Sequence, residues 1–120
     1  MKPKIKEKWD EALRSGIYPQ GKFRLYDGTN YCCLGVLCKL YLNETCQTWE
    51  EEYYEDGSSR DEYYIDSESE VLPTVVREWA GLTNADPLVG IDVETLSLAN
   101  LNDEKGYTFS QIADVIKAQL

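Results

Sequence analysis

Four cysteines, Cys32, Cys33, Cys38 and Cys46, are the side chains of this sequence best suited to bind a metal ion. However, the C-x2-C pairs of a zinc site are missing. Cys33 and Cys38 are five residues apart on a predicted helix and do not present their thiols to one ion. Disulfides require an oxidising compartment, which nothing else in the sequence indicates. We therefore expect no metal site, and cysteines that pack as small hydrophobic side chains.

Histidine is absent, so Ser-His-Asp and Cys-His catalytic arrangements are excluded. The 22 Asp and Glu residues contain carboxylates that could form an acid–base pair of the kind used in glycoside hydrolysis, but no spacing selects two of them. A glycine-rich phosphate loop is also missing. The sequence predicts a protein that is not an enzyme and has no cofactor.

The strongest chemical signal is the segment from Glu50 to Glu70, which holds ten acidic residues and one basic residue, Arg60. This segment carries −9 of the net charge of −10. An acidic face suits a basic partner protein, and the interleaved tyrosines are typical of residues that dominate binding energy at interfaces. Acidity that only keeps the protein soluble is the simpler interpretation. The predicted partner-binding residues are Glu50, Glu51, Glu52, Tyr53, Tyr54, Asp61, Glu62, Tyr63 and Tyr64.

The first forty residues suggest a different candidate site, because they carry a net charge of +4. In this alternative, an oligomer binds a small nucleotide through basic side chains and through aromatic side chains that stack on the base. The residues of this ligand-binding alternative are Arg14, Tyr18, Gln20, Lys22 and Arg24.

Direct reading of nucleic acid and insertion into a membrane are both disfavoured. Binding to a nucleic-acid backbone requires a cationic footprint, whereas residues 41–120 carry −14. The helix predicted from Phe109 is similar to the first helix of a helix-turn-helix unit, but no recognition helix follows it. No apolar run approaches the ~20 residues that span a bilayer.

Helices are predicted where apolar residues recur at helical spacing. The helix from Cys33 to Leu42 is apolar over most of its circumference, so we expect it to be the buried centre of the fold. Gly35 inside it is less favourable than alanine by about 1 kcal/mol, which indicates that another backbone passes close by. The other predicted helices cover residues 3–15, a short segment from Pro73 to Gly81, residues 96–101 and a final segment that begins at the Thr108 capping box.

Two hairpins are predicted between these helices, in residues 17–32 and in residues 49–66, with a short strand at 88–91. The second hairpin is centred on Ser58-Ser59, so that Tyr53 pairs with Tyr64 and Tyr54 pairs with Tyr63. Asn102 and Asp103 are predicted to form a turn in which Asn102 caps the preceding helix. The sequence thus predicts an α+β fold, a single compact domain of residues 1–120 with four to five short helices packed on small antiparallel β-hairpins. The acidic hairpin 49–66 is expected to be an insertion in this domain.

Several stretches resemble an uncharacterised family of small tailed-phage proteins. The main ones are Trp9–Gly16, Cys32–Cys38, Leu101–Asp103 and Thr108–Asp114, and they cover most of the chain except the acidic segment. The resemblance carries no known activity. It implies an accessory phage protein that is cytoplasmic in the infected host cell, and small accessory phage proteins often act against host systems.

Three functions remain in view. The first is a non-enzymatic inhibitor whose acidic surface occupies a basic surface on a host protein, counteracting a host defence system. The second is an oligomeric sponge that sequesters a small nucleotide immune signal. The third is a minor virion or structural protein.

Overall fold

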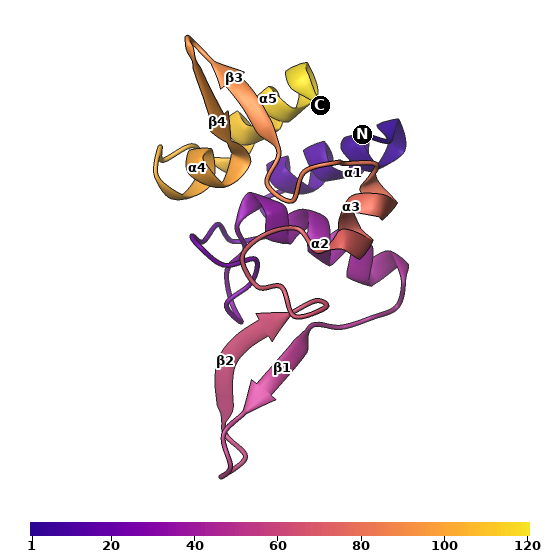
Figure 1. Cartoon of the computed structure of the whole chain (residues 1–120), viewed down its shortest axis with the longest axis vertical. Helices are drawn as coiled ribbons and strands as arrows, with labels where there is room; N and C mark the ends of the chain where they lie inside the picture. Colours follow the sequence, from indigo (N-terminus) through magenta and orange to yellow (C-terminus); the bar gives the residue numbers. More distant parts are fainter.

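The computed structural model describes residues 1–120 as an α+β fold of five helices and two antiparallel two-stranded hairpins, which confirms the predicted fold class. The helices form the middle of the molecule, and the hairpins lie towards opposite ends of its longest dimension (Figure 1). That dimension is 50 Å, against 28 Å and 25 Å for the other two. None of the helices combines the length and hydropathy needed to cross a membrane. In chain order, the elements are α1 (Pro3–Arg14), α2 (Cys33–Glu44), β1 (Glu50–Tyr53), β2 (Ser59–Tyr64), α3 (Thr74–Ala80), β3 (Leu88–Ile91), β4 (Glu94–Ser97), α4 (Leu98–Asp103) and α5 (Phe109–Gln119).

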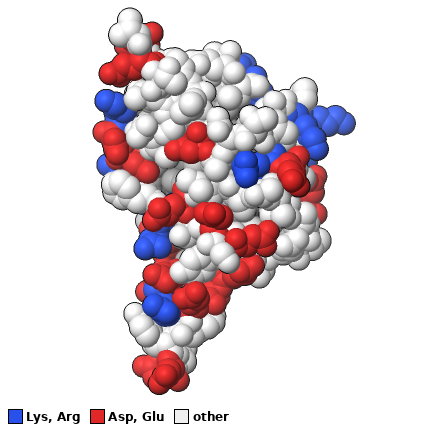
Figure 2. Space-filling view, in the orientation of Figure 1, with Lys and Arg blue, Asp and Glu red and all other residues white.

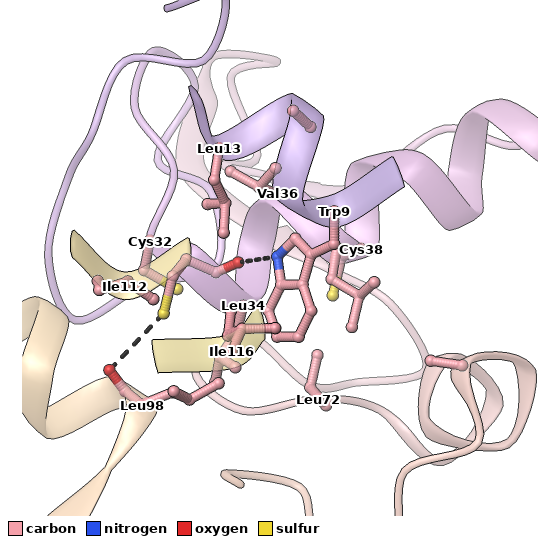
Figure 3. Close-up of a cluster of buried hydrophobic side chains, with 14 of the residues drawn as sticks. Trp9, Leu13, Cys32, Leu34, Val36, Cys38, Leu72, Leu98, Ile112 and Ile116 are labelled. Atoms are coloured by element: carbon pink, nitrogen blue, oxygen red, sulfur yellow. Dashed lines mark hydrogen bonds between the residues drawn. The ribbon is translucent and has the colours of Figure 1, made fainter. Parts of the chain in front are cut away.

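Helix α2 is the buried centre of the core, as its apolar circumference predicts. Trp9 of α1 packs against it and donates a hydrogen bond from its indole nitrogen to the Cys33 carbonyl oxygen, at 3.0 Å (Figure 3). The side chains of Cys32, Cys33 and Cys38 are buried, which confirms their predicted packing role. Cys46 is exposed, so the packing role predicted for this cysteine is wrong. Burial raises the pKa of the Cys32 thiol to about 12, so this thiol stays protonated at neutral pH.

Gly35 allows a loop to cross α2 at van der Waals distance. A Cβ atom at this position would lie 1.7 Å from the Leu25 carbonyl oxygen, closer than any side chain can approach. The close backbone expected from a glycine inside this helix is therefore present. Because Leu25 is fully buried at this crossing, residues 17–32 are fixed against the core.

The predicted hairpin in residues 17–32 is wrong, because this segment is an irregular loop with only isolated bridges. A few of its backbone groups bond to one another, such as Gly21 N–H to the Tyr31 carbonyl oxygen at 2.7 Å, but they form no continuous ladder, and others bond to distant partners. Leu25 N–H donates to the Ser69 carbonyl oxygen at 2.8 Å, and Phe23 N–H donates to the Asp103 carboxylate at 2.9 Å. Phe23 also has a φ of 69° and is 63% exposed, so the alternation that suggested a strand does not define one sheet face.

Asn102 connects this loop to the core through a buried side chain that is 1% exposed. Its oxygen accepts hydrogen bonds from the Cys33 backbone N–H at 3.2 Å and from the Gln20 side chain at 3.0 Å. Its nitrogen donates to the Gly21 carbonyl oxygen and to the Asp103 carboxylate, both at 2.8 Å. All the hydrogen-bonding capacity of this amide is thus satisfied inside the protein.

The predicted turn at Asn102 and Asp103, with Asn102 capping the preceding helix, is therefore wrong. Helix α4 includes Asn102 and extends to Asp103, with Glu104 at its C-cap. The Asn102 side chain serves the N-terminus of α2 instead, where the N-cap residue Cys32 makes no side-chain hydrogen bond. The first backbone N–H groups of a helix have no acceptor inside the helix. Here Asn102, sixty-nine positions away in the sequence, supplies the acceptor for the Cys33 N–H.

The β3–β4 hairpin has a regular register and connects directly to α4. Its strands pair in one continuous register from Leu88 opposite Ser97 to Ile91 opposite Glu94. Leu96, predicted to be helical, therefore belongs to β4. Ser97 ends the strand and begins α4 with a capping box, which accounts for the shift of the helix start to Leu98.

Candidate partner-binding site

The β1–β2 hairpin carries all nine predicted partner-binding residues and projects away from the helices (Figure 1). All four residues of β1 are exposed, and Tyr53 and Tyr54 are each 57% exposed. Figure 2 shows mostly acidic side chains over this part of the molecule with a few basic ones among them, while other basic side chains lie beside the helices near the start of α1. The hairpin thus brings carboxylates and tyrosines together on one accessible element.

The turn of this hairpin is built around Gly57, whose φ of 87° suits glycine. Tyr54 N–H donates to the Ser58 carbonyl oxygen at 2.8 Å and closes the loop. Asp56 accepts hydrogen bonds from the hydroxyl and the backbone N–H of Ser58, and these lower the pKa of its carboxyl group. The Asp56 carboxylate is therefore both a turn-forming group and part of the negative surface.

The predicted tyrosine pairs are wrong. Tyr64 lies opposite Glu50, Tyr63 lies opposite Glu51, and Tyr53 lies opposite Ser59. The reason is that the turn is centred near Asp56 and not between Ser58 and Ser59.

A bulge in β2 then shifts the pairing part of the way back between Tyr53 and Glu51. Arg60, Asp61 and Glu62 together lie opposite the single residue Glu52, so β2 contains extra residues at this point. Asp61 adopts a left-handed conformation, with φ at 56°, and its N–H donates to the Ser59 hydroxyl at 3.0 Å. Charge and tyrosine symmetry along the sequence did not reveal this interruption.

Local hydrogen bonds organise the hairpin surface without neutralising it. Arg60, its one cation, bonds to Glu52 at 3.2 Å and lies over the Tyr54 ring, with 5.4 Å between the guanidinium carbon and the ring centroid. The Tyr53 hydroxyl donates to the Glu51 carboxylate at 3.0 Å, and this hydrogen bond raises the pKa of Tyr53. Tyr53 is therefore neutral at physiological pH, and the carboxylates define the charge.

An aromatic cluster attaches the base of the hairpin to the loop 17–32. The Tyr26 ring stacks on Tyr31 with centroids 4.6 Å apart and on Trp49 at 5.3 Å. It also contacts Tyr63 of β2 at 4.8 Å, and Tyr18 packs edge-on against Tyr31 at 5.4 Å. We call Tyr18, Tyr26, Tyr31, Trp49 and Tyr63 the aromatic anchor. Aromatic pairs contribute about 0.5–1.5 kcal/mol beyond area burial, so this anchor holds the hairpin at a defined position.

Comparison with protein families places the whole chain in one family. The model described as "Domain of unknown function (DUF8296)" matches residues 1–120. The chain belongs to this family. No curated protein and no solved structure matches it significantly. The range that matches the DUF8296 model includes the acidic hairpin as well as the helices.

The ligand-binding alternative is not assembled into one site in this DUF8296 domain. Arg14 bonds to Asp10 at 3.0 Å and to Asp114 at 2.7 Å, so two carboxylates already occupy its guanidinium group. Gln20 donates to Asn102 and to the Tyr107 carbonyl oxygen, which makes it part of the internal network. Tyr18 belongs to the aromatic anchor.

The two remaining residues of this set, Lys22 and Arg24, form no ion pair. Lys22 lines a shallow hollow of about 290 Å³ with Gln20 and residues 106–108, whereas Tyr18 lines a different hollow beside Ile17. The structure also brings no group of three or more cysteine, aspartate and glutamate side chains together at metal-binding distances.

Sequence reasoning missed Tyr26 and Trp49 as parts of the candidate site. Both lie outside the acidic segment Glu50–Glu70, in the predicted hairpins 17–32 and 49–66, and no sequence pattern indicated that their rings stack on each other. A usable signal was present, because Tyr26 directly precedes the Asp27 turn and Trp49 directly precedes β1. Aromatic residues beside a projecting strand are candidates for its attachment.

Proposed function

We propose that this DUF8296 protein is a non-enzymatic binding protein whose β1–β2 hairpin occupies a basic surface on a partner protein. The observation that carries the proposal is the placement of the nine predicted residues on one projecting hairpin that is held only at its base. Arg60 is its single cation, and it already bonds to Glu52. The remaining carboxylates are available to lysine and arginine side chains of a partner.

The biological setting we propose is a phage accessory protein that counteracts a host defence system by this inhibition. Its support is the resemblance of Trp9–Gly16 and Cys32–Cys38 to small tailed-phage proteins. The nucleotide sponge has less support, because Arg14 and Gln20 are engaged in internal contacts.

A capture experiment with host lysate tests the proposal. In the hairpin variant, Glu50, Glu51, Glu52 and Glu62 are changed to Gln and Asp61 is changed to Asn. Asparagine tolerates the left-handed conformation of Asp61. We expect this variant to lose at least about 90% of the captured partner, because the removed charges provide the electrostatic complementarity.

The matched control removes the same number of charges from the rest of the surface. Its substitutions are Glu7→Gln, Glu11→Gln, Glu78→Gln, Glu94→Gln and Glu104→Gln, at exposed positions that form no ion pair. This control should capture the partner as well as the unmodified protein does. Equal losses in both variants would show that net charge alone attracts the partner, and retention by the hairpin variant would refute the proposed site.

A further inference from the structure

The two outer edges of the β1–β2 hairpin differ in how well they could pair with another strand. A two-stranded sheet leaves one edge of each strand without a strand partner. The bulge at Asp61 interrupts β2, and the Asp61 N–H already donates to Ser59. The edge of β2 is therefore poorly suited to a regular third strand.

The outer edge of β1 has no such protection. All four residues from Glu50 to Tyr53 are exposed, and their backbone groups form no hydrogen bonds outside the pairing with β2. Natural edge strands are commonly blocked by charged side chains, lysine above all, by proline or by bulges. The three glutamates of β1 repel an acidic strand, including a second copy of β1, but not a basic one. β1 contains no lysine or proline, and the extra residues of the bulge lie in β2.

The other hairpin shows how this protein blocks an edge. Gln119 at the end of α5 accepts a hydrogen bond from the Gly90 N–H and donates one to the Gly90 carbonyl oxygen, both at 2.8 Å. The Gln119 amide thus occupies the edge of β3 in the way that a neighbouring strand would. No side chain does this for β1.

We propose that the edge of β1 accepts an extended, lysine- or arginine-rich segment of the partner as a third strand. This inference rests on the proposed function and specifies how the acidic hairpin recognises its partner. Backbone hydrogen bonds supply affinity in such strand addition, and side-chain complementarity supplies selectivity.

Charge complementarity identifies the occupant. Side chains alternate between the faces of a strand, so Glu50 and Glu52 lie on one face of β1 and Glu51 lies on the other. Basic side chains on either face of an added strand would therefore meet a carboxylate. A hollow of about 220 Å³ can receive one such side chain; it is lined by the three glutamates of β1 and, across the hairpin, by Tyr64 of β2 and Ser67.

The test compares two synthetic decapeptides of equal charge with the full-length protein. One peptide alternates lysine and valine, which favour a strand, and the other alternates lysine and proline, which prevents a regular strand ladder. We expect the Lys-Val peptide to bind about tenfold more tightly, a difference of about 1.4 kcal/mol. Amide hydrogen exchange at Glu50–Tyr53 should slow when the Lys-Val peptide binds and should not slow when the Lys-Pro peptide is added.

The other outcomes separate strand addition from charge capture. Equal binding of both peptides without slower exchange at β1 would overturn strand addition and leave the proposed acidic binding site intact. Slower exchange at β2 or at Glu94–Ser97 of β4 would overturn the assignment to β1, and absence of binding by either peptide would refute the inference. The hairpin variant described above should lose affinity for both peptides, and unchanged affinity would show that they bind elsewhere.

Discussion

The two hairpins of this protein are both isolated two-stranded sheets, but they differ in how the rest of the fold supports them. β3–β4 has an uninterrupted register, continues into α4 through the Ser97 capping box, and has its β3 edge closed by Gln119. β1–β2 has a bulge and an uncovered β1 edge, and it stands away from the helices (Figure 1). An isolated two-stranded hairpin is marginally stable in water. β3–β4 is therefore built as part of the framework, whereas β1–β2 is positioned by its base and exposes the rest.

We expect the aromatic anchor at the base of β1–β2 to keep this hairpin ordered. Removal of the Tyr26 ring should have the largest effect of the substitutions considered below. Tyr26→Ala removes contacts with Tyr31, Trp49 and Tyr63. We expect the free energy of unfolding, measured with urea, to fall by about 2–3 kcal/mol. Amide hydrogen exchange should accelerate across residues 50–64 and remain unchanged across residues 88–97.

Tyr26→Phe is the matched control for this prediction. It keeps the stacked ring and removes only the hydrogen bond from the Tyr26 hydroxyl to the Gly28 carbonyl oxygen. The expected loss is about 1 kcal/mol or less. Equal acceleration of exchange in both hairpins of Tyr26→Ala would mean that the aromatic anchor supports the whole fold and does not distinguish the hairpins.

The contrast between the hairpins also explains which features the sequence could predict. The helices and the Thr108 capping box depend on residues within a few positions of one another, and these predictions are confirmed except for the bounds of α4. Gly35 was informative about a distant contact because glycine is unfavourable inside a helix and requires a reason. The register of the β1–β2 hairpin was not predictable in this way. Its bulge depends on the left-handed conformation of Asp61, and the neighbouring residues carry no strong signal for that conformation.

The loop 17–32 and Asn102 depend on partners far away in the sequence. Asn102 bonds to Gly21 and Cys33, at separations of 81 and 69 residues. No periodicity encodes such pairs. The acidic part of the candidate site was predictable because charge is a property of composition, whereas its attachment through Tyr26 became visible only in three dimensions.

Gln119 provides the complementary test, on the hairpin whose edge is closed. Gln119→Ala removes two hydrogen bonds to Gly90. Because both are exposed, we expect the free energy of unfolding to fall by about 1 kcal/mol. The Gly90 amide should exchange faster, while exchange across residues 50–64 should not change.

Gln119→Glu is a graded control, since it retains an acceptor for the Gly90 N–H and lacks the donor for the carbonyl oxygen. Its loss of stability should lie between those of the unmodified protein and Gln119→Ala. If Gln119→Ala leaves Gly90 exchange unchanged, the side chain does not close the β3 edge, and the difference between the two hairpin edges disappears.

The smallest expected effect concerns the turn that follows Tyr26. The Asn30 and Thr29 backbone N–H groups donate to the Asp27 carboxylate, and these hydrogen bonds, that from Asn30 above all, lower its pKa below the usual 3.8. A carboxyl group with a lowered folded-state pKa stabilises the protein above its unfolded pKa, and this contribution is lost as the pH falls through the folded value.

Asp27→Asn should therefore be less stable than the unmodified protein at pH 6, and the two should converge as the pH falls below about 4. Because Asp27 is exposed, the difference at pH 6 should be under about 1 kcal/mol. Thermal unfolding of both proteins from pH 6 to pH 2 measures it. Asp92→Asn, in the β3–β4 loop where the Asp92 side chain has no hydrogen bond, should follow the unmodified protein at every pH. If the Asp27→Asn and unmodified curves instead stay parallel down to pH 2, the Asp27 charge does not stabilise the turn, and the aromatic anchor alone positions the acidic hairpin.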